Sequence, residues 1–452
     1  MRTRAQRRVA ARNAWDRLEV SFWFAPAIMS VAAVLLAWVM FWIDSHISNV
    51  ALQSSRFVLS GTPGELRSAL LNMAGTVLAT AGVVFTLLTL PLSTVAAQYG
   101  SRLLRVFLGD RTTQFVLGMI VGTFVYCIAA ALSIPPTSVE QEAPQLTATV
   151  GVYLMLATFG TLILLVQHIS TMLQAPNIAA AAGAEMREVI DAGMPDEVTS
   201  DPDAARGPQL PLGDASDDRM EAEGYAIRAR RTGYIQYIDP DIMLTLAGER
   251  DLVIRLLRKP GDYIHDGALI ALASPAAQID ERLDKLIRRA FRIGNGRTPT
   301  QDIEYAVNQL TEMAVRAMSP AINDPFTAMT CLDHIGHGLA RFVRHGEMGS
   351  HYYNRDGKLR LIMEPVTLAE LLGAAFDMLR HASCDNASVL LRMLDVIELI
   401  GREAKSPEAQ RLLLEHACLI EAESRVGGLI EQDRQAIRLR GQALRVKLAD
   451  AA

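Results

Sequence analysis

Apolar residues dominate the first part of the chain in four long stretches, and amphipathic patterns take over after them. Four stretches contain no Lys, Arg, Asp or Glu, namely residues 22–43, 71–97, 112–134 and 147–167. Each is long enough to cross a bilayer, which takes about 20 apolar residues in a helix. The first stretch is too long and too aromatic for a cleaved signal peptide. The pattern predicts a four-helix transmembrane domain with a basic N-terminus over residues 1–175.

The second stretch differs from the others because it is rich in glycine, alanine and hydroxyl-bearing residues, with Pro91 inside it. Its polar residues fall near one another on a helical wheel. Two interpretations are open: this face lines a water-filled pore or cavity, or it packs tightly against another helix, for which small side chains are equally suited. The pore-lining candidates are Asn72, Thr76, Thr86, Thr89 and Ser93.

Basic residues that flank the apolar stretches indicate the orientation in the membrane. The segment before the first stretch and the connection after the second carry most of them, whereas the other two connections carry few. Because cytoplasmic flanks are enriched in Lys and Arg, both termini are expected in the cytoplasm. The cytoplasmic set is Arg2, Arg4, Arg7, Arg8, Arg12, Arg17, Arg102, Arg105 and Arg111, and the opposite set is Arg56 and Arg67.

A change of pattern after the fourth stretch predicts further domains. Residues 176–222 begin as a helical extension and continue as an acidic linker rich in Pro and Gly, which cannot bury a core. Residues 223–275 alternate with a period of two and predict a small β module. Its P-G-D-Y-I spacing at 260–264 resembles the barrel-sandwich hybrid of biotinyl and lipoyl domains. The segment 239–251 lacks the lysine that carries their cofactor, which favours a structural or oligomerising module.

Residues 276–452 return to helical spacing and predict a mainly helical cytoplasmic domain. Thr367 with Glu370 fits a capping box, and Ser406 precedes a proline at a helix start. A hairpin around Asp356–Gly357 interrupts the helices. The predicted fold is therefore an α-helical membrane protein with four transmembrane helices, followed by a cytoplasmic small β module and an α-helical bundle domain.

Composition excludes several classes of protein. Half of the 452 residues are hydrophobic and 21% are charged, with a net charge of −5, which argues against a general nucleic-acid binder. The four cysteines form no CxxC pair and are expected to be reduced. Nucleotide-binding, hydrolase and zinc-protease motifs are missing from the sequence, so no enzyme activity and no cofactor are expected. Spans without charged residues also argue against a proton-coupled transporter.

One cluster has the residue types of a metal site. His334 and His337 are three residues apart and can share a helix face, and Cys331 or Asp333 could add a ligand. Such residues on helices are more often exposed or hydrogen-bonded polar groups, and the sequence supplies no second ligand helix. No metal site is predicted.

A second cluster combines arginines with helix-capping residues. Thr298 or Thr300 is expected to cap a helix that begins near Gln301, while Asp324 caps the next helix and Asn323 adopts a left-handed turn. The charged residues either form a buried ion-pair network, which is the favoured interpretation, or bind an anionic ligand. The candidates are Arg297, Asp302, Arg316, Asn323 and Asp324.

Three parts of the chain resemble the bacterial domain-of-unknown-function (DUF) 2254 family of predicted membrane proteins. They comprise GVVFT at 82–86 with QYGSRLLR at 98–105, TQFVLG at 113–118 with GTFVYC at 122–127, and RTPTQD at 297–302 with SPAINDPFTA at 319–328. The resemblance implies a multi-pass protein of the bacterial inner membrane with a cytoplasmic domain. It implies no reaction, because no activity of the family can be transferred.

These features together favour a homo-oligomeric channel or pore-like protein that conducts an ion or small solute through the bilayer. The cytoplasmic part would form a vestibule or gating domain. The alternative is a membrane-anchored ligand-sensing or scaffold protein that uses the cytoplasmic Arg/Asp turn. A membrane enzyme built on the Cys331–His337 cluster is the remaining, less favoured class.

Overall fold

The computed structural model describes residues 23–46, 58–98, 110–134, 143–193, 220, 224–346, 349–354 and 357–450. The chain forms two compact units, Met1–Ile178 and Ala179–Ala452. Several sequence predictions lie outside the described residues, namely the arginines before the first span, Arg56, Arg102, Arg105, most of the acidic linker, and Asp356 of the hairpin turn.

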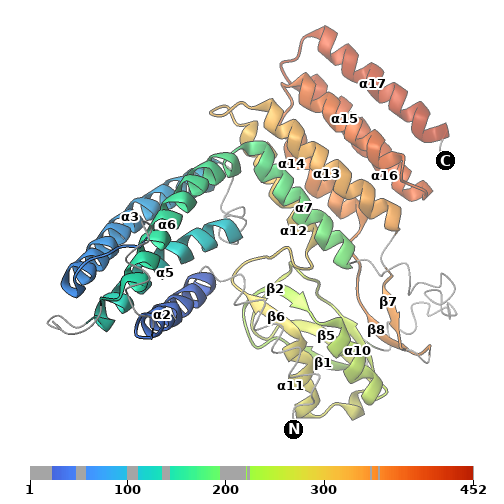
Figure 1. Cartoon of the computed structure of the whole chain (residues 1–452). Coiled ribbons are helices and arrows are strands. Elements are labelled where there is room, and N and C mark those ends of the chain that lie inside the picture. Colours follow the sequence, from blue (N-terminus) through green and yellow to red (C-terminus); the bar gives the residue numbers. More distant parts are fainter. Residues whose placement is uncertain are drawn as a thin grey trace. The chain divides into compact units, whose positions relative to one another are not determined.

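Four long apolar helices build the first unit (Figure 1). They are α2 (Phe24–Asp44), α3 (Pro63–Gln98), α5 (Arg111–Ser133) and α6 (Gln145–Met172). Each is long and apolar enough to cross a membrane, in α3 over Pro63–Thr89. The prediction of four apolar helices at this end of the chain is therefore confirmed.

Helix α5 is the most buried of the four and packs against α2, α3 and α6. Gly118 and Gly122 allow α2 to approach closely, because a Cβ atom at Gly118 would lie 2.3 Å from the sulfur of Met29. Leu117 and Ile120 are buried beside them. Small residues at helix crossings are typical of membrane domains, where close backbone approach supplies much of the packing energy.

A buried carboxylate ties the end of α2 to the start of α6. Asp44 accepts hydrogen bonds from the backbone N–H groups of Leu146 (3.0 Å) and Thr147 (2.8 Å). It therefore satisfies donors that a helix N-terminus leaves free, and its negative charge complements the helix dipole. The hydroxyl of Tyr126 on α5 donates to the carbonyl of Thr147 at 2.9 Å, which adds the third helix to this junction.

The second unit contains two small sheets. Their elements are β1 (Tyr225–Arg228), β2 (Gly233–Ile238), α10 (Pro240–Glu249), β3 (Val253–Leu256), β4 (Tyr263–Ile264), β5 (Leu269–Ser274), η3 (Ala276–Gln278), α11 (Glu281–Ala290) and β6 (Phe291–Gly294). The three-stranded sheet has the order β4-β2-β6 and the five-stranded sheet the order β1-β5-β3-β8-β7. The two sheets and α11 share one buried hydrophobic core, which includes Ile235 of β2, Ile254 of β3 and Ile287 of α11.

Two strands of the larger sheet come from much later in the sequence. β7 (His351–Tyr353) and β8 (Leu359–Ile362) form the predicted hairpin. β8 also pairs in parallel with β3, with Ile254 opposite Leu361. The β module therefore includes residues from the predicted helical region. Its comparison with a barrel-sandwich hybrid stays a prediction.

Helices make up the rest of the second unit. They are α7 (Ala175–Gly193), α12 (Ile303–Ala317), α13 (Pro325–His345), α14 (Leu368–Ala382), α15 (Ala387–Gly401), α16 (Pro407–Val426) and α17 (Glu431–Asp450). The Thr367–Glu370 capping box is present, and Ser406 caps α16 as predicted. On α7, Gly183 lies against His334 of α13, where a Cβ atom would come within 2.8 Å of the imidazole-bearing carbon.

Candidate functional site

The polar face of α3 is not the face that packs inside its own unit. Leu66, Leu70, Ala74, Val77 and Val84 on α3 are buried against neighbouring helices. The pore-lining candidates lie on the other side of the helix and are exposed; they are Asn72, Thr76, Thr86, Thr89 and Ser93. Helix α3 continues through Pro91 to Gln98. The predicted stripe is thus presented outward along one uninterrupted helix.

The threonines of this stripe bond to their own helix. Thr76 donates to the carbonyl of Asn72 (3.0 Å), and Thr86 and Thr89 donate to carbonyls one turn earlier (3.1 and 2.7 Å). Each hydroxyl oxygen keeps lone pairs that can accept a further hydrogen bond. A Cβ atom added at Gly75 or Gly82 would meet no other atom within 4 Å, so the helix surface is open between the threonines.

The Arg/Asp turn contains a nearly buried ion pair. Arg297 binds both carboxylate oxygens of Asp302, at 2.7 and 2.8 Å, and also reaches Glu304 at 3.3 Å. Its guanidinium lies 5.6 Å from the ring centre of Tyr305. Burial alone would lower the pKa of Arg297, but the hydrogen bonds and charge of Asp302 raise it. Arg297 and Asp302 therefore form a structural ion pair, as in the network interpretation.

Capping of α12 differs from the sequence prediction. Asp302, not Thr298 or Thr300, accepts the hydrogen bond from a first-turn N–H group, that of Tyr305, at 2.9 Å. The two threonines instead belong to a segment that runs alongside β2. In this segment Gln301 exchanges hydrogen bonds with the backbone of Ile238 at 2.8 and 2.9 Å. A short carboxylate directly before the helix is the better cap.

Gly261 brings the P-G-D turn onto this ion pair. It has φ +98°, and a Cβ atom there would lie 2.4 Å from a carboxylate oxygen of Asp302 and 3.0 Å from a guanidinium nitrogen of Arg297. The backbone N–H of Gly261 donates to the carbonyl of Ile235 on β2 at 2.8 Å. Residues 260–262 and 297–302, which form separate motifs in the sequence, therefore meet at one joint between the β module and α12.

Two other members of the turn, Asn323 and Asp324, act as predicted for capping. Asn323 is left-handed, with φ +48°, and Asp324 caps α13 by accepting from Thr327 N–H at 3.1 Å. Arg316 pairs with Glu312 one turn earlier on its own helix at 3.0 Å. These contacts account for the side chains without a ligand.

The Cys331–His337 cluster does not converge on one point. Cys331 is buried in the bundle, where burial raises the pKa of its thiol to about 12. Asp333 binds Arg392 through both oxygens, at 2.6 and 2.7 Å, while His334 faces Gly183 and His337 is exposed. Within the described ranges, no three His, Cys, Asp or Glu side chains are placed to hold a metal ion.

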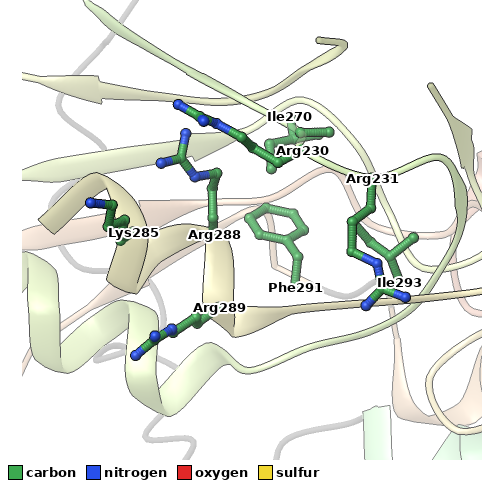
Figure 2. Close-up of a pocket in the computed structure, with 9 residues that line it drawn as sticks. Arg230, Arg231, Ile270, Lys285, Arg288, Arg289, Phe291 and Ile293 are labelled. Atoms are coloured by element: carbon green, nitrogen blue, oxygen red, sulfur yellow. The ribbon is translucent and has the colours of Figure 1, made fainter. Parts of the chain in front are cut away.

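Sequence reasoning missed a basic pocket in the β module (Figure 2). The pocket is a cavity of about 290 Å³ between the β1–β2 turn, α11 and β6. Its lining residues are Ala229, Arg230, Arg231, Ile270, Lys285, Arg288, Arg289, Phe291 and Ile293. The available signal was two short basic runs, RARR at 228–231 and KLIRR at 285–289, which the acidic overall charge concealed.

Comparison with known proteins identifies one matching family. The model of the family described as "Predicted membrane protein (DUF2254)" matches residues 19–398. Uncharacterized proteins of Mycobacterium bovis and Mycobacterium tuberculosis are 25% identical to this chain over 361 residues, which cover 78% of this chain and 67% of each relative. No solved structure matches the chain significantly.

Proposed function

We propose that this chain, which belongs to the DUF2254 family of predicted membrane proteins, assembles into a homo-oligomeric channel or pore-like protein. Helix α3 lines the path, and the second unit forms a cytoplasmic vestibule or gating domain. The observation that carries the proposal is the exposed stripe of amide, hydroxyl and glycine residues on α3, which points away from the helices of its own unit.

The cost of placing this stripe against lipid supports assembly. An amide side chain such as Asn72 finds no hydrogen-bond partner among acyl chains, and burying such a group unpaired costs roughly 2 kcal/mol or more. In an oligomer, the stripe faces water or another copy of the chain, and its polar atoms are satisfied. By contrast, the exposed residues of α2, including Val31, Leu35 and Trp38, are apolar and suit contact with lipid.

The nature of the stripe favours passive conduction. Its side chains are neutral, and proton-coupled transport usually requires ionisable groups within the spans. From the positive-inside rule, we expect both termini of each chain in the cytoplasm of the bacterium, with the four helices crossing the inner membrane. No catalytic role is part of the proposal.

Flux through reconstituted protein tests the pore. We expect liposomes containing the full chain to release K⁺, Na⁺ or Cl⁻, and the double substitution Thr86→Leu/Thr89→Leu to reduce that flux at least about tenfold by replacing polar wall with branched apolar side chains. Leu87→Phe is the matched control, because it also adds apolar bulk at an exposed position of the same turn. Leu87 lies about 100° from Thr86 and about 160° from Thr89 around the helix.

Particle size in detergent accompanies the flux assay, so that loss of assembly is distinguished from a blocked path. Unchanged flux in a correctly assembled double variant would contradict the assignment of α3 as the pore wall. A monomeric wild-type protein would contradict the proposal as a whole.

The alternative of a ligand sensor built on the Arg/Asp turn gains little support, because Arg297 and Asp302 already bind each other. If the second unit binds a charged ligand, side chains outside this turn must provide the opposite charge.

A further inference from the structure

Two elements of the β module bring five cationic side chains to one cavity. Arg230 and Arg231 come from the turn between β1 and β2, whereas Lys285, Arg288 and Arg289 come from α11. In Figure 2 the ring of Phe291 lies between Arg288 and Arg231, and the heads of Arg230 and Arg288 point to the same side. The cavity therefore has a small apolar floor and a strongly positive rim.

The backbone that presents these residues is firmly held. Ala229, at the start of the turn, donates its backbone N–H to the carbonyl of Ala268 (2.8 Å) and accepts from the N–H of Gly267 (3.0 Å). Gly233, with φ +150°, brings β2 against β6, since a Cβ atom there would lie 2.5 Å from the carbonyl oxygen of Gly294. The cations are thus displayed from fixed positions, which lowers the entropy cost of binding a ligand.

The positive charge of the rim is only partly neutralised. Lys285 pairs with Glu281 and Arg288 with Asp284, each one turn earlier on α11. For Arg230, Arg231 and Arg289, the described part of the chain provides no hydrogen-bonded or ion-paired carboxylate. Elsewhere in the second unit, Arg297, Arg392 and Arg445 each bind a carboxylate directly.

The positive electrostatic potential at the rim affects the neighbouring carboxylate of Glu281. A hydrogen bond from Lys285 lowers the pKa of Glu281, and the charges of Arg230 and Arg288 lower it further. Arg230 therefore acts at the same place as the α11 residues, although it lies on a separate element far away in sequence. Favourable interaction with the C-terminal end of α11 explains Arg288 and Arg289 by themselves but does not explain the two turn arginines.

From this convergence we infer that the pocket binds a ligand carrying one or more phosphate groups. The neighbouring guanidinium groups of Arg230 and Arg288, with further cations on the rim, match the geometry and charge of phosphate oxygens better than those of a single carboxylate. The volume of about 290 Å³ is at the lower end for small-molecule sites and accommodates a phosphate-bearing head group. The same chemistry occurs in soluble phosphorylated metabolites and in the head groups of anionic lipids.

Binding to the full-length protein tests the inference and separates the two sources. One arm places the protein in neutral phosphatidylcholine nanodiscs and adds pyrophosphate or ATP, with calorimetry as the readout. The other arm measures retention of detergent-purified protein on phosphatidylglycerol or cardiolipin vesicles, compared with phosphatidylcholine vesicles. Binding in the first arm identifies a soluble ligand, and binding confined to the second identifies a lipid head group.

The double variant Arg230→Gln/Arg289→Gln is expected to weaken binding at least about tenfold in whichever arm is positive, because each arginine contributes a charge-assisted contact. Arg258→Gln/Arg282→Gln is the matched control: it removes the same charge from exposed positions of the same unit, outside the pocket lining. The control should stay within about twofold of the wild-type affinity.

Two results would overturn the inference. An equal loss in both double variants would show general attraction of anions to a basic surface, and absence of binding in both arms would leave the pocket without a phosphate ligand. Neither result bears on flux through α3, so the pore proposal stands or falls separately.

Discussion

Asp302 illustrates how one side chain serves several purposes at the joint of the second unit. It caps α12, neutralises Arg297 and lies against the backbone of Gly261. The glycine is needed for two reasons: its φ of +98° is unfavourable for other residues, and the ion pair occupies the space of a side chain.

Gly261→Ala therefore should destabilise the second unit by about 3 kcal/mol, from a strained backbone together with a displaced ion pair. Gly267→Ala is the matched control because it has φ +82° but open space around its Cβ position. We expect it to cost only about 1 to 2 kcal/mol. Hydrogen exchange of peptides covering residues 233–238 and 297–302 measures both. Equal effects of the two variants would mean that the ion pair moves aside without cost.

Rules based on neighbouring residues in sequence correctly predicted the conformation of several single residues. They failed where contacts with a segment distant in sequence determine the structure. Asn323, Asp324 and Thr367 follow the prediction because capping and left-handed turns depend on neighbours in sequence. The cap of α12 was wrongly predicted as Thr298 or Thr300 because nothing local shows that residues 297–301 run along β2. The basic pocket was missed for the same reason, since its two halves come together only in the folded β module.

At the scale of elements, a buried glutamate joins α15 to α17. Glu398 on α15 accepts from Lys447 on α17 at 2.8 Å and from Arg402 at 2.7 Å, and also binds Arg440 on α17. These contacts, led by Lys447, lower the pKa of Glu398 from an ordinary value of 4.5 to about 2. The ionised carboxylate of Glu398 therefore holds α17 against α15 through ion pairs.

Acid should loosen this contact. A pKa that is lower in the folded state contributes stability that is complete above pH 4.5 and is lost as the pH falls toward about 2. After correction of hydrogen exchange for its intrinsic rate at each pH, we expect the opening free energy of α17 to fall as the pH is lowered from 4.5 toward about 2, by about 2 kcal/mol beyond the general acid effect. This figure is below the full pKa shift because solvent screens part of the contact. Glu398→Gln should make α17 exchange faster at pH 6 and remove most of this additional dependence.

Glu415→Gln is the control for this experiment, because Glu415 is exposed on α16 and has no ion pair among the described residues. An unchanged pH dependence in Glu398→Gln, equal to that of the control, would show that other groups fasten α17.

Element boundaries were predicted unevenly for physical reasons. Hydropathy located the four apolar helices, but α3 begins at Pro63 instead of residue 71, because a helix continues through charged residues such as Glu65 that leave the apolar zone. The predicted hairpin at β7 and β8 is present, whereas its parallel pairing with β3 depends on a contact between remote segments.

At the scale of the whole molecule, the proposed assembly brings the α3 stripes of several copies together. A single cysteine at Ala79, which lies exposed on the stripe, should then be joined between copies by a short thiol cross-linker. Replacing Cys384 and Cys418 with serine removes the thiols that are not fully buried. Val39→Cys on α2 is the control, since this exposed position is expected to face lipid.

Cross-linked dimers and higher species are expected for Ala79→Cys in membranes and at most a trace for Val39→Cys, as seen by denaturing electrophoresis. Similar yields at both positions would indicate random encounters and would contradict a specific α3 interface.

The pairing of β3 with β8 also determines the order in which the chain can mature. β3 leaves the ribosome long before β8 exists, and α12 and α13 are synthesised in between. Until then one edge of β3 is open, and open edges are sites of unwanted association between nascent chains. Any premature stop before residue 359 leaves that edge permanently uncovered. The β module is therefore not an independent domain. A fragment or fusion that ends before β8 should aggregate, even though it contains β1 to β6.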